Sequence, residues 1–338
     1  MVLSKPPARA SIRDVAARAG VSRQTVSRVL NDLPGMSEET AARVRAVIAE
    51  LDYRPNRAAR TLATSRHRTI GLITTAPREF GPASIALAIE RAAREYDYAL
   101  ASVSAASDGE EEIAEALDEL VRWGVDGIVV IAPQAASWPL IQERLGTMPS
   151  LTLQWSGGPA NTAAIDQRVG AVAATRHLIG LGHRRILHLA GPEGWAEVDQ
   201  RIAGYREALA QADLEPLAPV RGDWTADSGY EVGLRILPGR DFTAVFASND
   251  QMAIGLLHAA REAGVEVPLE LSVVGFDDIP EARHAAPPLT TVRQGFTALG
   301  DTAMRRLIAV VERRPVPDGE VPDQTTFVVR ESTAPPQP

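Results

Sequence analysis

The sequence predicts an α/β protein that has a small helical head at its N-terminus and, behind it, two consecutive units of doubly wound parallel sheet. Three observations lead to this division. A helix-turn-helix pattern occupies Arg13–Asn31, apolar runs alternate with helical segments from Thr69 onward, and the charge changes sign between the two parts. A chain of 338 residues is long enough for two or three domains.

The head begins with two short predicted helices joined by a tight turn. The first helix carries apolar residues on one face, namely Val15, Ala16 and Ala19. Gly20 can adopt a positive φ and so end that helix, and Val21 turns back toward the core. Ser22 is a suitable N-cap for a second helix that runs to about Leu30.

The second helix separates an apolar face from a polar one. Its buried face is expected to contain Val26, Val29 and Leu30, which leaves four residues exposed: Arg23, Gln24, Ser27 and Arg28. Long hydrogen-bonding side chains at the start of an exposed helix suit the major groove of DNA. A plain helical hairpin whose basic residues are only solvated would show the same periodicity, so the pattern alone leaves both interpretations open.

A third amphipathic helix is predicted in SEETAARVRAVIAELDY, with Val44, Val47, Ile48 and Leu51 on one face. The helix ends at Arg54 because the residue before a proline is biased toward extended backbone. Residues 56–63 are too few for a stable free helix, so the residues alone predict a flexible basic linker there.

The net charge of −8 is unevenly distributed along the chain. Residues 1–68 contain 13 Lys and Arg against 6 Asp and Glu, a net charge of +7, whereas the remainder contains 22 against 37, a net charge of −15. A basic head on an acidic body confines the attraction to phosphate to one end of the molecule. The head is therefore the expected contact with nucleic acid.

The composition excludes several classes of protein. The chain has no cysteine, which argues against disulfides, a thiolate nucleophile and a zinc finger. The first ten residues lack the apolar run of a signal peptide, and no stretch approaches the roughly 18 apolar residues that a membrane span needs. We expect a cytoplasmic, nucleoid-associated protein without membrane contact.

The body alternates strands and helices, which is typical of parallel doubly wound sheets. The predicted strands are 70–74, 98–103, 127–131, 150–154, 185–190, 244–248 and 272–276, and the predicted helices are 85–96, 111–123, 169–181, 200–212, 228–237 and 251–263. Two consecutive α/β units fit about 260 residues better than one.

Several motifs stand at the spacing of a known family. In the head these are DVA, AGVS, QTVSRV and PNR, and in the body HLIGLGHRRILHLAGP, RGDWTADSGY, ASNDQMAIG, LSVVGFDD and PPLTTVRQ. The chain resembles the LacI/GalR family of transcriptional regulators over nearly its whole length. The resemblance implies a DNA-binding headpiece at 1–53 (ordered from about 11), a hinge helix and linker at 54–68, and a two-lobed periplasmic-binding-protein-like core at 69–338 that binds an effector and dimerises. Lobe 1 would span about 69–165 and 292–322, and lobe 2 about 166–291 and 323–332.

The resemblance also implies roles in DNA binding. Arg23 and Arg28 are suited to guanine edges and Gln24 to adenine. Other residues are better placed for phosphate or general DNA contacts: Arg13, Ser22, Thr25, Ser27, Asn31 and Ser37. In the family's hinge helix, which forms on DNA, the matching residues are Asn56, Arg57, Ala59 and Leu62. Leu62 would wedge between base pairs in the minor groove and bend the duplex.

Polar residues that follow predicted strands indicate a ligand site, because open α/β sheets bind ligands beyond the carboxyl ends of their strands. Gln154, Asn249 and Asp277 stand at such positions, although ordinary helix caps occur there equally often. The resemblance adds Thr75, Arg201, Trp224, Gln294 and Phe296 as effector-contacting residues.

The sequence departs from the family pattern at three points. Gln154 stands where an acidic residue is common, Ile131 replaces a polar residue, and residues 79–84 (EFGPAS) replace the usual segment after the first strand. These departures leave the identity of the effector open between a sugar, which GDW and NDQMA favour, and a purine.

The sequence therefore predicts a homodimeric, sugar-responsive transcriptional regulator, most simply a repressor, that binds a pseudo-palindromic operator. No cofactor, metal site or catalytic residue is expected: G-x-S-x-G and Walker motifs are absent, and His177, His183 and His188 are spread over a helix, a turn and a strand. A sugar-binding transport protein and a sugar-modifying enzyme are the rival classes. We expect a dimer rather than a tetramer, because FVVRESTAPPQP is too short and proline-rich for a coiled coil.

Overall fold

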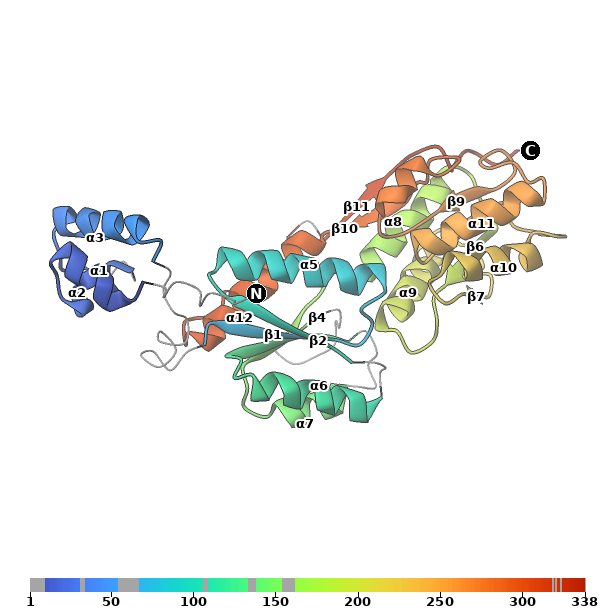
Figure 1. The fold of residues 1–338 in the computed structure, drawn as a ribbon. Helices are drawn as coiled ribbons and strands as arrows, with labels where there is room; N and C mark the ends of the chain where they lie inside the picture. Colours follow the sequence, from blue (N-terminus) through green and yellow to red (C-terminus); the bar gives the residue numbers. More distant parts are fainter. Residues whose placement is uncertain are drawn as a thin grey trace, which may run out of the picture. The chain divides into compact units, whose positions relative to one another are not determined.

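The computed structural model describes residues 10–30, 34–53, 67–105, 109–132, 138–153, 162–317, 319, 321–322 and 324–337. The chain divides into two compact units between His67 and Arg68. Figure 1 shows the elements of each unit, and the two units are described separately below.

The N-terminal unit contains three helices: α1 (Ile12–Ala19), α2 (Arg23–Leu30) and α3 (Glu38–Glu50). They enclose a small apolar core built mainly from Val15, Ala16, Ala19, Val26, Val29, Ala41, Val44 and Val47. Gly20 ends α1 at a φ of 67°, and the Val21 N–H then donates to the Ala16 carbonyl at 3.0 Å. The predicted helix-turn-helix is confirmed, except that Leu30 is only half-buried.

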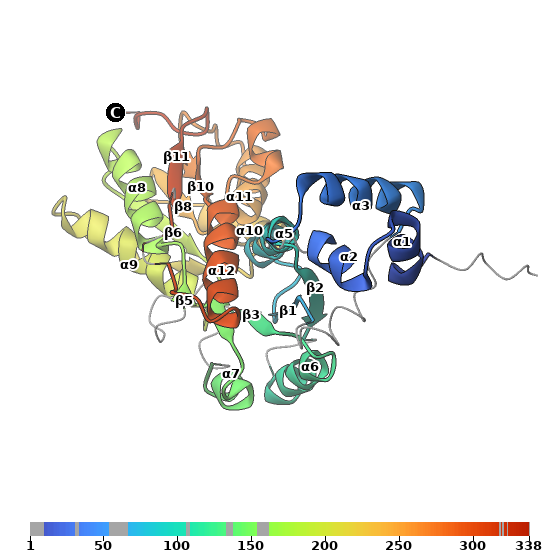
Figure 2. The same ribbon diagram turned by 90° about the vertical axis from the view of Figure 1, so that its left-hand side faces the viewer.

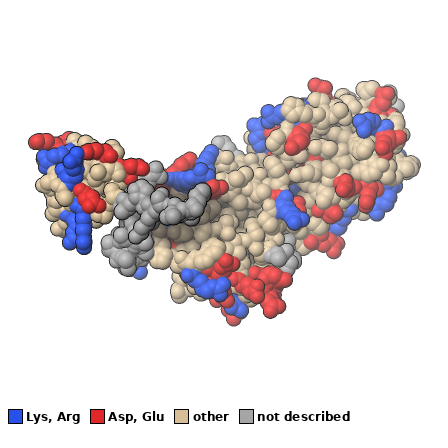
Figure 3. All heavy atoms as spheres, in the orientation of Figure 1, with Lys and Arg blue, Asp and Glu red and all other residues tan. Residues whose placement is uncertain are grey.

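The first lobe of the second unit is built on a five-stranded parallel sheet in the order β2-β1-β3-β4-β5. Its strands are β1 (Thr69–Thr74), β2 (Ala99–Ser104), β3 (Gly127–Ile131), β4 (Ser150–Leu153) and β5 (Thr162–Ala163). Helices α5 (Phe80–Glu95) and α12 (Phe296–Val311) cover one face, and α6 (Glu110–Arg122) and α7 (Trp138–Leu145) cover the other (Figure 1). Figure 3 shows acidic side chains over α6, whose first turn contributes Glu110, Glu111 and Glu112.

The second lobe is built on a four-stranded parallel sheet in the order β7-β6-β8-β9. Its strands are β6 (Ile186–Ala190), β7 (Val220–Arg221), β8 (Ala244–Ala247) and β9 (Ser272–Val274). Helices α8 (Gln167–Gly180) and α9 (Ala196–Ala210) pack on one face, and α10 (Ala226–Ile236) and α11 (Asp250–Glu262) on the other. A 3-10 helix, η2 (Pro280–His284), follows the last of these strands.

A two-stranded antiparallel ribbon links the lobes. It pairs β10 (Thr291–Gln294) with β11 (Thr325–Val328), in a register that joins Thr291 to Val328. Helix α12 lies between these strands in sequence and packs beside α5 of the first lobe, as Figure 2 shows. Beyond β11 the chain returns to the second lobe, where the Val273 N–H donates to the Ser332 carbonyl at 2.8 Å.

The predicted fold class, a helix-turn-helix head with a core of doubly wound parallel sheets, is confirmed. The predicted strands all appear within about a residue or two of their expected positions, whereas several helices begin earlier than expected. Helices α5, α8 and α9 were expected to start at 85, 169 and 200, and they start at Phe80, Gln167 and Ala196. Among the described residues no helix is both long and apolar enough to cross a membrane.

Candidate functional site

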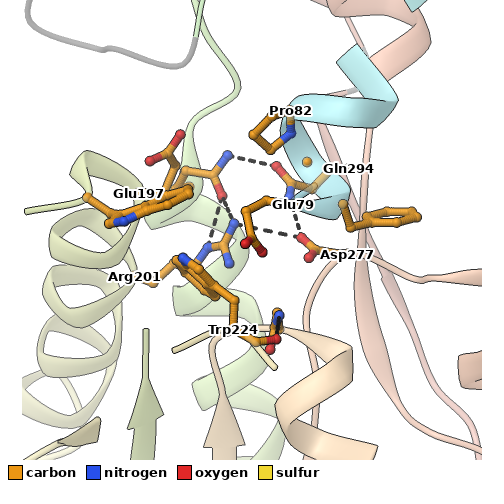
Figure 4. Close-up of a pocket in the computed structure, with 12 residues that line it drawn as sticks. Glu79, Pro82, Glu197, Arg201, Trp224, Asp277 and Gln294 are labelled. Carbon is orange, nitrogen blue, oxygen red and sulfur yellow. Dashed lines mark hydrogen bonds and ion pairs between the residues drawn. The ribbon is translucent and has the colours of Figure 1, made fainter. Parts of the chain in front are cut away.

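A pocket opens between the two lobes of the core, with about 390 Å³ of empty space when its solvent-filled mouth is included (Figure 4). The start of α5 supplies the wall from the first lobe, through Glu79, Phe80, Gly81 and Pro82. The other lining residues are Gln167, Trp195, Glu197, Arg201, Trp224, Asn249, Asp277 and Gln294.

Four lining residues form a closed ring of polar side chains, which we call the polar ring: Gln167, Arg201, Asp277 and Gln294. Arg201 donates from Nη2 to Gln167 Oε1 at 2.8 Å, and Gln167 Nε2 donates to Gln294 Oε1 at 2.7 Å. Gln294 Nε2 donates to Asp277 Oδ1 at 2.6 Å, and that oxygen lies 3.7 Å from Arg201 Nη2. The polar ring joins the start of α8 and the second turn of α9 to the end of β10 and the loop that follows β9, so it fixes these elements relative to one another.

Burial changes the titration of the polar ring. Burial raises the pKa of Asp277 to about 6, and Glu79 adds to this, although Arg201 and the hydrogen bond from Gln294 oppose it. Burial also lowers the pKa of Arg201, whose guanidinium donates to the Ser248 carbonyl and lies 4.0 Å above the Phe276 ring. An ion pair removed from water in this way gains stability only when its remaining hydrogen-bonding groups also find partners, and Gln167, Gln294 and the Ser248 carbonyl supply such partners here.

Trp224 is held in an uncommon backbone conformation, with a φ of 78°. Its carbonyl accepts a hydrogen bond from Asn249 Nδ2 at 2.8 Å, while Asn249 Oδ1 caps α11 by accepting from the Met252 N–H at 3.0 Å. A Cβ at Gly191 would lie 2.4 Å from the Trp224 ring, so only glycine leaves room for the indole there. Trp195 meets Trp224 edge-on at 5.3 Å, and the two rings give the pocket an aromatic wall.

Two further carboxylates line the pocket. Glu197 is 4% exposed, and burial raises its pKa to about 7. Glu79 is half-buried and its pKa is raised, first by burial and then by repulsion from Asp223. Figure 4 shows the side chain of Glu79, the residue just before α5, reaching toward Arg201 and Asp277 of the other lobe.

The structure brings together most of the residues that the sequence assigned to the effector. Arg201, Trp224, Asn249, Asp277 and Gln294 all line the pocket. Asn249 is at the same time an ordinary helix cap, so the alternative interpretation of that residue is also confirmed.

Of the three other residues assigned to the effector, two lie away from the pocket lining and one is not described. Thr75 is buried just after β1 and Phe296 packs edge-on against the lining residue Phe80 at 6.1 Å, so neither lines the pocket. Gln154 lies outside the described residues. Asp278 diverges from its neighbour Asp277, because it pairs with Arg293 at 2.7 Å and with Arg330 at 2.5 Å.

Sequence reasoning missed several lining residues, of which Glu197, Gln167 and Trp195 are the most informative. Glu197 stands four residues before Arg201 and therefore on the same face of α9, a spacing that could have revealed it. Gln167 carries no comparable signal. The segment 79–84 was singled out as a departure from the family pattern, and four lining residues come from it.

The N-terminal unit presents the start of α2 to solvent. Ser22 caps this helix, since its Oγ accepts from the Thr25 N–H at 3.1 Å, and the Arg23 and Gln24 side chains are exposed. Arg28 corrects the sequence-based expectation of an exposed side chain: it is half-buried, and its guanidinium donates to the Pro34 carbonyl. The turn at Pro34 and Gly35 folds back onto α2, which the helical periodicity could not show.

The other residues expected at DNA are only partly described. Ser27 is half-buried, Arg13 is exposed on α1, and Ser37 caps α3 by accepting from the Thr40 N–H at 3.3 Å. The remaining ones lie outside the described residues: Asn31, Asn56, Arg57, Ala59 and Leu62.

The histidines of the core do not converge on one point. His177 bonds to Thr333 at 2.9 Å, His183 to Thr243 at 2.8 Å, and His188 to the Phe246 carbonyl at 2.8 Å. Within the described ranges, no group of three or more His, Cys, Asp or Glu side chains could hold a metal ion.

Comparison with protein families gives two matches along the chain. The model of bacterial regulatory proteins of the lacI family matches residues 11–56, which include the helix-turn-helix. The model of the periplasmic binding protein-like domain matches residues 175–333.

Relatives of the chain match it over most of their length. The lactose operon repressor of Escherichia coli (strain K12) is 34% identical, with 97% of this chain and 93% of that protein covered. The ribose operon repressor of the same strain is 34% identical, with 88% and 92% covered. The HTH-type transcriptional repressor PurR of Haemophilus influenzae (strain PittEE) is 33% identical, with 88% and 90% covered.

Solved structures agree with these matches. The lac repressor dimer bound to operator and the anti-inducer ONPF has a TM-score of 0.83 at 32% identity, covering 97% of this chain and 100% of that chain. The complex of the transcriptional regulator CelR with cellobiose has a TM-score of 0.69 at 32% identity, covering 96% and 100%.

Proposed function

The chain belongs to the LacI family of bacterial regulatory proteins, and from that premise we propose that it is a transcriptional repressor whose affinity for operator DNA is controlled by a small molecule bound between the core lobes. The relatives reported above are named as repressors or regulators, and none is named as an enzyme. A protein that binds operator DNA works at the nucleoid, so we place it in the cytoplasm.

One observation carries the DNA-binding part of the proposal, namely the exposed start of α2. Arg23 and Gln24 extend from a capped helix of a headpiece that matches the family model. An arginine suits the guanine edge and a glutamine the adenine edge in the major groove. Two headpieces of a homodimer would read the two halves of a pseudo-palindromic operator.

The pocket supports a sugar as the effector. Its polar ring can order hydroxyl groups, and its indole wall suits the apolar face of a sugar. The structural relatives include a regulator in complex with cellobiose and a lac repressor in complex with ONPG. A purine is the second candidate, because repressors named PurR are as similar in sequence as the ribose operon repressor.

The position of the pocket suggests how binding would reach the DNA. A ligand that touches both the start of α5 and the polar ring stabilises one arrangement of the lobes. In a dimer, a change in that arrangement changes the spacing of the hinge segments 54–68 and therefore operator affinity. We assign Leu62 of this hinge to the minor-groove wedge.

The test is a selection of genomic DNA fragments by the full-length protein, followed by gel shifts on the selected sites. We expect a pseudo-palindromic site whose affinity falls steeply with salt, as phosphate contacts require. Binding of all fragments with equal affinity would contradict a sequence-specific function.

A further inference from the structure

The pocket contains buried polar atoms that have no hydrogen-bond partner among the residues that the structure describes. Neither carboxylate oxygen of Glu197 accepts a hydrogen bond from another described residue, and the indole N–H of Trp224 donates none. The two side chains are 4% and 8% exposed, and both line the pocket. Buried polar groups without partners carry a large free-energy cost, so a ligand that bonds to them gains what the apo protein lacks.

The charges of the pocket restrict that ligand. The lining residues include three carboxylates, those of Glu79, Glu197 and Asp277, and a single basic side chain, Arg201. The guanidinium of Arg201 is already committed to Gln167, to the Ser248 carbonyl and to Asp277. An anionic group entering the pocket would therefore meet unpaired negative charge, and the lining that the structure describes offers no uncommitted cation to receive it.

The chemistry of the unpartnered atoms matches a hydroxyl-rich molecule. A carboxylate accepts hydrogen bonds from hydroxyl groups, and such charge-assisted bonds are stronger than neutral ones. An indole N–H donates to a hydroxyl or ring oxygen. Phe80, Trp195 and Trp224 supply apolar surface beside these groups.

We propose that Glu197 and the Trp224 indole N–H are the residues that select the effector, and that the effector is a sugar without an anionic group. Glu197 accepts hydrogen bonds from its hydroxyls, and Trp224 donates to one of its oxygens. Phosphorylated sugars and sugar acids are rejected because their charge faces Glu79 and Glu197. This inference rests on the proposed function, since it names the ligand class of the same pocket.

Calorimetric titration of the full-length protein tests the ligand class. The probes are neutral sugars (glucose, galactose, ribose, lactose and cellobiose), the purines adenine and guanine, and then the phosphorylated and uronic acid counterparts of the sugar that binds. Measurement at pH 8 keeps Glu197 ionised, since its pKa is about 7. We expect the anionic counterpart to bind at least about 100-fold more weakly than the neutral sugar, since an unpaired like charge is brought into the pocket.

Variants then test the two residues. Glu197→Gln keeps the size of the side chain but removes the charge, and Trp224→Phe keeps an aromatic ring but removes the N–H. Each should weaken binding of the neutral sugar about tenfold or more, as the loss of a hydrogen bond to a buried group predicts. Asp199→Asn is the matched control, because Asp199 lies two residues from Glu197 on α9 but is exposed and outside the pocket.

Circular dichroism and melting curves establish whether each variant is folded. Glu197→Gln and Trp224→Phe test the pocket independently, so if one variant does not fold, the other still decides the outcome. Tight binding of a phosphorylated or acidic sugar, preferential binding of a purine, or binding of none of the neutral sugars would overturn the proposal. So would unchanged affinity in the folded variants. Failure to select any DNA site would instead contradict the proposed function and leave the sugar titration unaffected.

Discussion

Replacing Glu197 by glutamine should stabilise the ligand-free protein at alkaline pH, although it should weaken ligand binding. Burial raises the pKa of Glu197 from its ordinary value of 4.5 to about 7, so the folded state holds this proton more tightly than the unfolded state. The resulting stability is complete below about pH 4.5 and is lost as the pH rises through about 7. Since one pKa unit corresponds to about 1.36 kcal/mol, the loss is about 3 kcal/mol, most of it between pH 5 and pH 8.

Glutamine has no charge to bury, so it should escape this loss. The free energy of unfolding of Glu197→Gln, relative to the parent protein, should increase by about 2–3 kcal/mol from pH 5 to pH 8. Asp277 is present in both proteins, and because its charge also raises the pKa of Glu197, the difference between the proteins includes the repulsion between these two carboxylates.

Urea unfolding of both proteins at pH 5 and pH 8, followed by tryptophan fluorescence, measures their free energies of unfolding. The comparison requires that the free energy of unfolding falls equally steeply with urea concentration in both proteins. Asp199→Asn serves as the control and should show no such change, because Asp199 is exposed. The contrary result is that Glu197→Gln and the parent protein differ in free energy of unfolding by the same amount at pH 5 and pH 8. That result would show that Glu197 is not a buried, uncompensated charge.

Three further substitutions test the other assigned roles. Gln24→Ala should cost about 1–3 kcal/mol at the cognate operator and little on random DNA, and equal losses in gel shifts on both would remove Gln24 from base recognition. Arg201→Ala should abolish the response to effector and, because it leaves Asp277 buried without its cation, should also destabilise the core by about 3–5 kcal/mol; a response at unchanged effector concentrations would exclude Arg201 from the site. Leu62→Ala should leave folding and effector binding unchanged but reduce operator affinity and DNA bending, most of all at operators with a flexible pyrimidine–purine step at the centre. Circular-permutation gel shifts measure this, and unchanged bending would make residues 56–63 a simple basic tether.

The sequence predicted the sheets well because buried parallel strands are continuous apolar runs. The stretches around β1, β3 and β8 contain little else, and their side chains are almost completely buried. The helices of the headpiece were also predicted well, because Gly20 ends α1 and Ser22 caps α2, which are the roles that their chemistry favours.

The first turns of the core helices were predicted poorly, and the pocket is built largely from them. Phe80, Pro82, Gln167 and Glu197 all lie in helical turns that precede the first expected helical residue. Apolar periodicity locates the part of a helix that packs on its sheet, whereas these turns extend past the sheet and face the pocket. Positions that face a pocket instead of a sheet need not follow the apolar pattern by which helices are recognised.

Local sequence also could not show how polar side chains are paired. Helical spacing predicts an exposed side chain at Arg28. In the structure this side chain is half-buried, and its guanidinium donates to the carbonyl of Pro34. The polar ring joins Gln167 to Gln294, which are 127 residues apart, and only the folded topology brings them within 2.7 Å.

The central claim is that one small molecule bound between the lobes controls operator binding. The most direct measurement is the affinity of the full-length protein for its operator with and without the sugar, together with its affinity for the sugar with and without the operator. Each pair of measurements gives a ratio of affinities, one for the operator and one for the sugar. Because coupling between two sites is reciprocal, the sugar should change operator affinity by the same factor as the operator changes sugar affinity, typically about 5–150-fold. Ratios of one in both directions, with both ligands binding tightly, would show that the pocket and the headpiece act independently and would contradict the account.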